Sequence, residues 1–124
     1  MLDAELIAEI LSQIENAISI VRRRFSIIHS TDDFLNTPEG LEKLDSIGMK
    51  LIAIGESVNN LDKHTKGALL QNYPDIDLKG VKGVRDIISH HYFDLDAEEI
   101  FNICDIHLPS LHTTIRQMIC DQKS

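Results

Sequence analysis

An apolar residue recurs every seven positions through the first 28 residues of the chain. A second apolar row lies three or four residues away, so both rows fall on one side of a helix. The two rows consist of Ile7, Ile14, Val21 and Ile28, and of Leu11, Ile18 and Phe25. Such a stripe is stable only when other helices cover it. The pattern therefore predicts a long first helix in an antiparallel bundle, beginning after Asp3, a good N-cap residue.

A second long helix is predicted from Pro38 to about Leu61. Thr37 supplies an N-cap, and proline suits the first helical position. Gly48 and Gly55 lie seven residues apart on the expected core face, where small residues let another helix approach closely, although each costs about 1 kcal/mol of helix propensity. The larger residues expected on that face are Leu41, Leu44, Leu51 and Val58. Residues 30–36, between the two helices, are predicted to be a polar connector.

Three further helices are predicted in the remainder of the chain. A short one spans Leu61 to Asn72, a second spans about Leu78 to Tyr92, and the last opens with a capping box at Asp96 and Glu99. Pro109 should kink the last helix. With 124 residues and no strand pattern or repeat, we expect an all-α fold: one antiparallel four- or five-helix bundle domain over residues 1–124.

Composition excludes some classes of function. The net charge of −8 argues against binding long duplexes by bulk electrostatics, and 5% aromatic residues without Trp disfavour a base-stacking surface. On one continuous helix Cys104 and Cys120 would lie about 24 Å apart, too far for a disulfide, which fits a reducing compartment. No apolar run has membrane-spanning length, and no signal-peptide pattern opens the chain. We expect a cytoplasmic protein that does not bind membranes.

Residues 85–92 form the densest cluster of chemically active groups. Lys79 and Lys82 lie just upstream, and Asp86 is the one acid among these residues. On a helical wheel His91 shares the apolar arc expected to face the core, as a core histidine would. Asp86 and His90 point away from the core, one turn apart. Arg85, Ser89 and Tyr92 follow one edge of the apolar arc, and His90 lies about 140° round the wheel from Arg85.

This spacing resembles a known signature. Arg85, the polar Asp86, three further residues, His90, any residue and Tyr92 are similar to the Arg-polar-x-x-x-His-x-Tyr motif of the HEPN ribonucleases, above all the HepT-like toxins. Residues 54–57, Ile-Gly-Glu-Ser, resemble the family's Ile-Gly-Glu-Ala segment, and residues 73–76, Tyr-Pro-Asp-Ile, resemble its Tyr-Pro-x-Ile lead-in. Asp86 stands where Asn is more usual, and Asp77-Leu78 stands where Pro-Trp is usual.

The residues suit metal-independent RNA cleavage. His90 can serve as acid or base near neutral pH, and Arg85 presents fixed donors to phosphate oxygens. Asp86 could orient the imidazole or tune the local charge, and Lys79 and Lys82 are expected to bind RNA. No cofactor and no metal site are expected. His107 and His112, for example, are five residues apart, which is poor spacing for metal ligation on a helix.

The resemblance implies partners and a modification. HEPN families imply an isologous homodimer, which would bring two copies of Arg85 and His90 to one cleft. HepT-like toxins are paired with a minimal nucleotidyltransferase antitoxin, which transfers AMP onto the signature tyrosine, here Tyr92. An added phosphate there would bring negative charge into the cation cluster and block the groove.

Other readings remain open at this point. The domain could be a non-catalytic, nucleotide-binding helical partner of a nucleotidyltransferase, or a structural bundle whose dimerisation helix is cationic. Residues 22–24, Arg-Arg-Arg, could complement the dipole of the first helix or contact phosphate. Glu56 could be an exposed acid, a member of an ion pair, or a catalytic group. The sequence does not name the RNA target, its cleavage site or the antitoxin.

Overall fold

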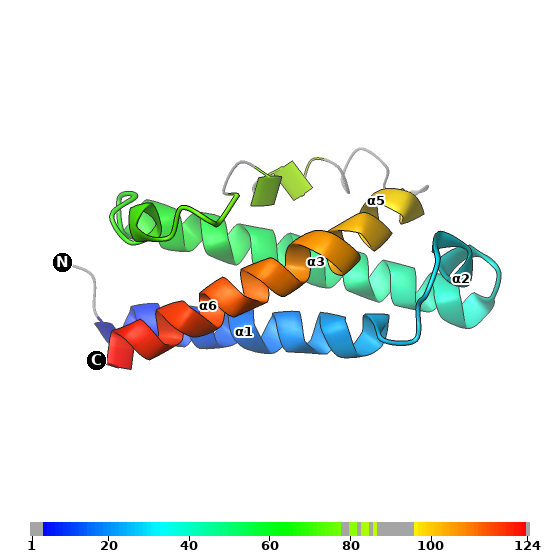
Figure 1. The fold of residues 1–124 in the computed structure, drawn as a ribbon, viewed down its shortest axis with the longest axis horizontal. Helices are drawn as coiled ribbons and strands as arrows, with labels where there is room; N and C mark the ends of the chain where they lie inside the picture. Colours follow the sequence, from blue (N-terminus) through cyan, green and yellow to red (C-terminus); the bar gives the residue numbers. More distant parts are fainter. Residues whose placement is uncertain (1–3, 78–79, 82, 85, 87–95, 124) are drawn as a thin grey trace.

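The structure is a computed structural model that describes residues 4–77, 80, 81, 83, 84, 86 and 96–123. Every regular element among these residues is helical, so the all-α bundle predicted from the sequence is confirmed. Three long helices form the bundle: α1 (Ala4–Phe25), α3 (Pro38–His64) and α6 (Leu108–Lys123). Helix α1 begins and α6 ends at the same end of the molecule (Figure 1). The described part also holds four short elements, α2 (Thr31–Leu35), η1 (Leu70–Asn72), α5 (Ala97–Asn102) and the π-helical turn η2 (Ile103–His107), and helical residues at 80, 81, 83, 84 and 86.

The heptad stripe of α1 is the core of the bundle. Leu11, Ile14, Ile18 and Val21 are all buried, as the sequence pattern predicts. Ile28 is buried too, although α1 ends at Phe25. The stripe faces both α3 and α6, which pack along α1. The predicted cap, Asp3, lies outside the described residues.

The connector between the two long helices is not simply polar, as the sequence had suggested. Residues Thr31–Leu35 form α2, because Phe34 turns inward and is 0% exposed. Its ring lies 6.2 Å from that of Phe25, measured between centroids. A Cβ added at Gly40 would collide with the carbonyl oxygen of Asp33, so the backbones of α2 and α3 touch there. Burial of one aromatic ring therefore outweighs the polar character of its neighbours.

Helix α3 begins as predicted. The Oγ1 of Thr37 accepts a hydrogen bond from the backbone N–H of Gly40 at 2.9 Å, and Pro38 occupies the first turn. Gly48 and Gly55 are buried. Leu41 was wrongly assigned to the core: it is 45% exposed, because it lies about 60° round the helix from Leu44, on the solvent side. The other three predicted core residues of this helix are buried: Leu44, Leu51 and Val58.

The predicted third helix over residues 61–72 is absent. Helix α3 instead continues to His64, and the chain then turns through Lys66 (φ 54°) and Gly67 (φ 78°). Positive φ at two consecutive residues is incompatible with a right-handed helix. Only η1 follows, and its Leu70 is buried against the bundle.

The C-terminal helical region is interrupted where Pro109 predicts it. Asp96 caps α5, and its Oδ1 accepts from the backbone N–H of Glu99 at 3.1 Å. The wide turn η2 ends at His107, two residues before Pro109. Proline has no N–H to offer the carbonyl of Asp105, and its ring crowds that carbonyl, so a wider turn relieves the clash.

Candidate functional site

The residues predicted to carry the chemistry lie mostly outside the part that the structure describes. Asp86 is the exception: it is helical and exposed, as the helical wheel requires. The assignments of Arg85, His90 and Tyr92, and of Lys79 and Lys82, therefore stay predictions. What the structure does describe is how the signature helix begins and what it packs against.

Asp77 starts the signature helix. Its Oδ1 accepts from the N–H of Gly80 at 3.0 Å, and its carbonyl accepts from the N–H of Val81 at 2.9 Å. This is N-cap geometry, and aspartate is well suited to it. A Cβ at Gly80 would collide with the Asp77 carboxylate, so glycine there makes room for the cap. Asp77, which stands where the family usually has Pro, thus serves as the cap of this helix. At Gly83 a Cβ would meet nothing within 4 Å.

Gly55 fixes the signature helix against α3. A Cβ on Gly55 would lie 2.9 Å from the carbonyl oxygen of Val81, so the two backbones are in close contact. Val81 and Val84 are half-buried and pack on the core, as the sequence pattern predicts. The small residue at position 55 therefore sets the distance of the signature helix from the bundle, which supports the predicted role of Gly55 in close helix approach.

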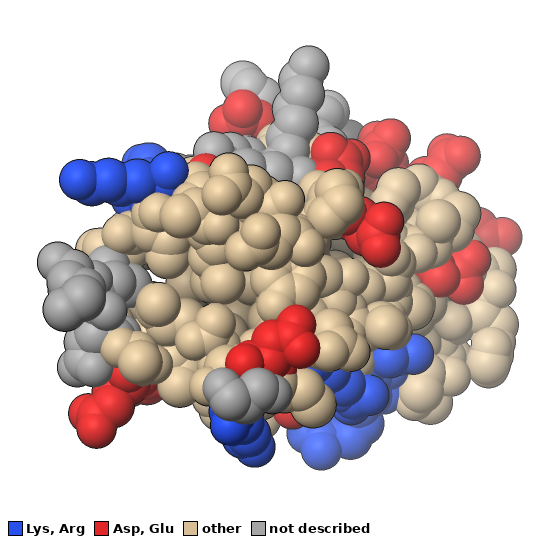
Figure 2. Space-filling model, turned by 60° about the vertical axis from the view of Figure 1, so that its left-hand side comes forward, with Lys and Arg blue, Asp and Glu red and all other residues tan. Residues whose placement is uncertain are grey.

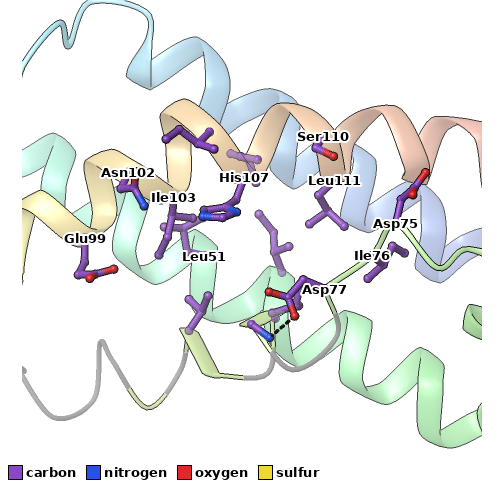
Figure 3. A pocket seen from close by; sticks show the side chains of 17 residues that line it. Leu51, Asp75, Ile76, Asp77, Glu99, Asn102, Ile103, His107, Ser110 and Leu111 are labelled. Atoms are coloured by element: carbon purple, nitrogen blue, oxygen red, sulfur yellow. Dashed lines mark hydrogen bonds between the residues drawn. The ribbon is translucent and has the colours of Figure 1, made fainter.

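A cavity of about 400 Å³ opens beside these turns. Apolar side chains of α3, the signature helix and the η2–α6 segment form its walls, among them Leu51, Ile54, Val81, Val84, Ile103 and Leu111. Figure 3 shows Glu99 and Asp75 at opposite ends of the lining residues, with Asp77 between them. A carboxylate about 4 Å from a phosphate charge would repel it by about 4 kcal/mol at an effective dielectric constant near 20. This cavity is thus a poor place for RNA phosphate.

A second polar centre joins α1 to α6. His112 is 2% exposed, and both of its ring nitrogens have partners on α1. Arg22 Nη1 lies 2.9 Å from His112 Nδ1, and Glu15 Oε2 lies 2.9 Å from His112 Nε2. Because a guanidinium can only donate, Nδ1 accepts, and the neutral imidazole carries its proton on Nε2, facing Glu15. We call these residues, with Ser19, the His112 cluster.

Glu15 is held in its ionised form within this cluster. The hydroxyl of Ser19 donates to its Oε2, which is the largest cause of a lowered Glu15 pKa. The hydrogen bond from His112 is the second cause and also lowers the pKa; burial raises it by less than either hydrogen bond lowers it, and the charge of Arg116 adds a smaller lowering. Sequence reasoning missed this cluster, because it considered His112 only as a metal ligand. The available signal was the spacing of Glu15, Ser19 and Arg22 along one edge of α1.

The comparisons with known proteins agree with this fold. The family model described as HepT-like ribonuclease matches residues 14–118, which include the lead-in, the signature stretch and the His112 cluster. The chain belongs to the HepT-like ribonuclease family. The resemblance drawn from the sequence motifs is therefore confirmed.

Relatives of this HepT-like chain include three proteins of Methanocaldococcus jannaschii. "Putative RNase MJ1216" is 26% identical over 106 aligned residues, covering 78% of this chain and 84% of the relative. "Putative RNase MJ0125" is 24% identical, covering 78% and 88%. "Putative RNase MJ0127" is 34% identical over a shorter stretch, covering 57% and 55%. No solved structure matches the chain significantly.

Among the described residues, no three side chains of His, Cys, Asp or Glu gather as a metal site would require. In the same part of the chain, no helix combines the length and the apolar character needed to cross a bilayer.

Proposed function

We propose that this HepT-like chain is a metal-independent endoribonuclease and the toxin of a toxin–antitoxin pair. The observation that carries the proposal is the family match over residues 14–118, within which Arg85, His90 and Tyr92 keep the signature spacing. The N-cap at Asp77 and the contact at Gly55 support it, because they hold the start of the signature helix firmly on the bundle.

The reaction uses the nucleophile that RNA itself carries. The 2′-oxygen forms a bond to the adjacent phosphorus while the bond from phosphorus to the 5′-oxygen breaks. One His90 takes the proton from the 2′-hydroxyl, and a second His90 gives a proton to the departing 5′-oxygen. Arg85 binds the phosphate oxygens, whose negative charge is greatest in the transition state. Asp86 orients or tunes the imidazole, and Lys79 and Lys82 hold the flanking phosphates.

Two histidines are needed, and each chain supplies one. An isologous dimer through the signature helices would provide both, with one Arg85 beside each. The dimer is therefore part of the proposal. Sedimentation or light scattering should find two chains per particle at the concentrations where RNA is cleaved.

The regulatory part of the proposal concerns Tyr92. A nucleotidyltransferase antitoxin would transfer AMP from a nucleotide to the phenol oxygen, with loss of pyrophosphate. The new phosphodiester places a negative charge beside Arg85, where the RNA phosphate would bind, and so blocks the cleft.

The activity test is the His90→Ala variant with EDTA present. General acid–base groups contribute roughly 10²–10⁴-fold, so RNA cleavage should fall by about that factor. His29→Ala is a matched control, because His29 is exposed and follows Arg24 at the same spacing as His90 follows Arg85. Full activity in His90→Ala would overturn the catalytic assignment and leave the non-catalytic binding partner as the better description.

The modification test is the Tyr92→Phe variant co-expressed with the candidate antitoxin. Mass spectrometry should find AMP on the wild-type chain and none on the variant. The variant should also stay toxic in the presence of the antitoxin. AMP found on another residue of Tyr92→Phe would overturn the assignment of Tyr92.

A further inference from the structure

Charge is distributed very unevenly along this chain. Residues 16–31 and 106–120 contain no Asp or Glu, although the chain has 20 of them. The same two segments hold four of the five arginines and three of the six histidines. One segment lies in α1 and the loop after it, and the other lies mainly in α6.

The fold brings these two segments together, because α1 and α6 pack side by side. Figure 2 shows lysine and arginine side chains along the lower edge of the molecule, on the side where α1 and α6 lie in Figure 1. Arg22, which contacts His112 of α6, and Arg116, whose charge acts on Glu15 of α1, are exposed at this seam. Arg23 is exposed on α1, about 100° round the helix from Arg22, whereas Arg24 is half-buried and lies about 100° further round. We call Arg22, Arg23 and Arg116 the arginine face.

The charge of the arginine face is largely uncompensated. Among the described residues, none of its three guanidiniums forms an ion pair within 4.0 Å of a carboxylate; the nearby carboxylate of Glu15 is instead hydrogen-bonded by His112. The charge of Arg116 acts on Glu15, while the two segments that carry the face contain no Asp or Glu, on a chain of net charge −8. Within residues 16–31 and 106–120, exposed polar neighbours of the face such as Asn16 and Thr113 are uncharged.

Arg22 is held in place without being neutralised. Its partner is the neutral Nδ1 of His112, while the nearby carboxylate of Glu15 is engaged by Ser19 and by His112 Nε2. A surface arginine held by a carboxylate would lose much of its attraction for an outside anion. Arg22 instead keeps its full charge and most of its N–H donors, in a fixed orientation that suits phosphate oxygens.

We propose that the arginine face is a second contact surface for the RNA substrate, and that it binds the sugar-phosphate backbone away from the cleavage residues. Arginine, together with neutral hydroxyl and amide side chains, commonly forms the contacts of proteins to phosphate and sugar. The proposal rests on the proposed ribonuclease function. Helix α3 lies between α1 and the described turns of the signature helix (Figure 1), so the substrate must be long enough to reach both surfaces.

A protein partner fits the arginine face less well than RNA does. Protein interfaces depend on buried aromatic or aliphatic anchors at their centre. The centre of this face carries no large exposed apolar side chain among the described residues. The exposed Ile27 follows the C-terminal end of α1, and the exposed Ile106 lies in η2. RNA phosphate needs no such anchor, because the electrostatic term supplies the affinity.

Binding is tested with the full-length chain and a long 2′-O-methyl RNA, which cannot be cleaved because it lacks the nucleophile. The double variant Arg23→Glu/Arg116→Glu should bind it about 10-fold more weakly, and the slope of log K against log salt should be smaller by about 1. The matched control is Lys63→Glu/Lys66→Glu, which makes the same charge change at two exposed sites elsewhere and should bind within about 2-fold of wild type. All four substitutions are at exposed positions, and circular dichroism checks that both variants fold.

The outcomes are distinct. Weaker binding confined to the arginine variant supports the face. Unchanged binding, or an equal loss in both double variants, overturns it. Cleavage is measured separately: kcat/KM of the arginine variant should fall about 10-fold for a long single strand and by less for a tetranucleotide, while an equal loss for both would count against a distant contact. If wild-type protein cleaves no RNA, the proposed function fails while the binding comparison still decides the arginine face.

Discussion

The two sides of this bundle treat charge in opposite ways. The seam between α1 and α6 carries the arginine face, and the carboxylate of Glu15 beside it is engaged by His112. The cavity between α3, the signature helix and the η2–α6 segment is apolar inside and has Asp75, Asp77 and Glu99 in its lining. A net charge of −8 describes neither side, because the fold sorts charges by face. We therefore expect an anion to be repelled from the cavity and attracted to the seam.

The two sides also differ in how they use histidine. His112 is buried in the seam with both nitrogens partnered, and His107 is exposed in the lining of the cavity. A buried polar group must have its partners, so the His112 cluster ties α1 to α6. On the cavity side, the start of the signature helix is instead held to the bundle by backbone contact and apolar packing. Mutations should therefore act on the two sides through different physics.

The largest expected effect is on the cavity side, at Gly55. Gly55→Val would push a side chain into the carbonyl of Val81, which is backbone and cannot yield. We expect the free energy of unfolding to fall by about 3 kcal/mol and RNA cleavage to be lost, measured by urea denaturation and a nuclease assay. Gly83→Ala is the matched control: it meets nothing within 4 Å and should gain about 0.5–1 kcal/mol of helix propensity. Equal behaviour of the two variants would contradict the close approach at Gly55.

The next effect is on the seam. His112→Ala leaves Arg22 and Glu15 without their shared partner, and we expect a loss of about 2 kcal/mol in the free energy of unfolding. His107→Ala, at an exposed position, should change it by less than about 0.5 kcal/mol. Denaturant midpoints of the two variants give the comparison. A larger loss for His107→Ala would mean that the seam is not what ties α6 to α1.

A smaller effect is the pH dependence that Glu15 adds to the seam. Its pKa is lowered in the folded chain from the ordinary 4.5, so the unfolded state binds more protons around and below that value. The stabilisation is therefore present above pH 4.5 and is lost as the pH falls through the folded-state pKa. Glu15→Gln should flatten this part of the stability–pH curve, and Ser19→Ala should flatten it partly, because the Ser19 hydroxyl is the largest cause of the shift. A curve unchanged by both variants would refute the assignment.

The smallest effect concerns Tyr73, in the lead-in to the signature helix. Its hydroxyl donates a hydrogen bond to Asp121 at 2.6 Å. Burial is the largest cause that raises the Tyr73 pKa to about 12, and this hydrogen bond is the next. The neutral phenol is thus favoured in the fold, and its contribution to stability is lost as the pH rises from about 10 toward 12. In an ultraviolet titration, Tyr73→Phe should lack the phenol ionisation that the wild-type chain shows near pH 12. A missing phenol near pH 10 would contradict the contact with Asp121.

Local features could be predicted from the sequence, because they depend on residues that are neighbours in the chain. The heptad stripe of α1, the caps at Thr37 and Asp96, the break at Pro109 and the small residue at Gly55 all follow from spacing and from side-chain chemistry within a few turns. The family was also readable, because its signature is a short motif. The roles of Arg85, His90 and Tyr92 stay predictions drawn from that motif.

Tertiary packing decided what spacing alone could not. It made Phe34 a core residue and so turned a polar connector into α2, and it left Leu41 in solvent. It also paired His112 with Arg22, 90 residues away in the chain, and placed two acid-free segments side by side. The reason is physical: caps and stripes are set by residues one turn apart, whereas burial, buried hydrogen bonds and the charge of a surface depend on which helices meet.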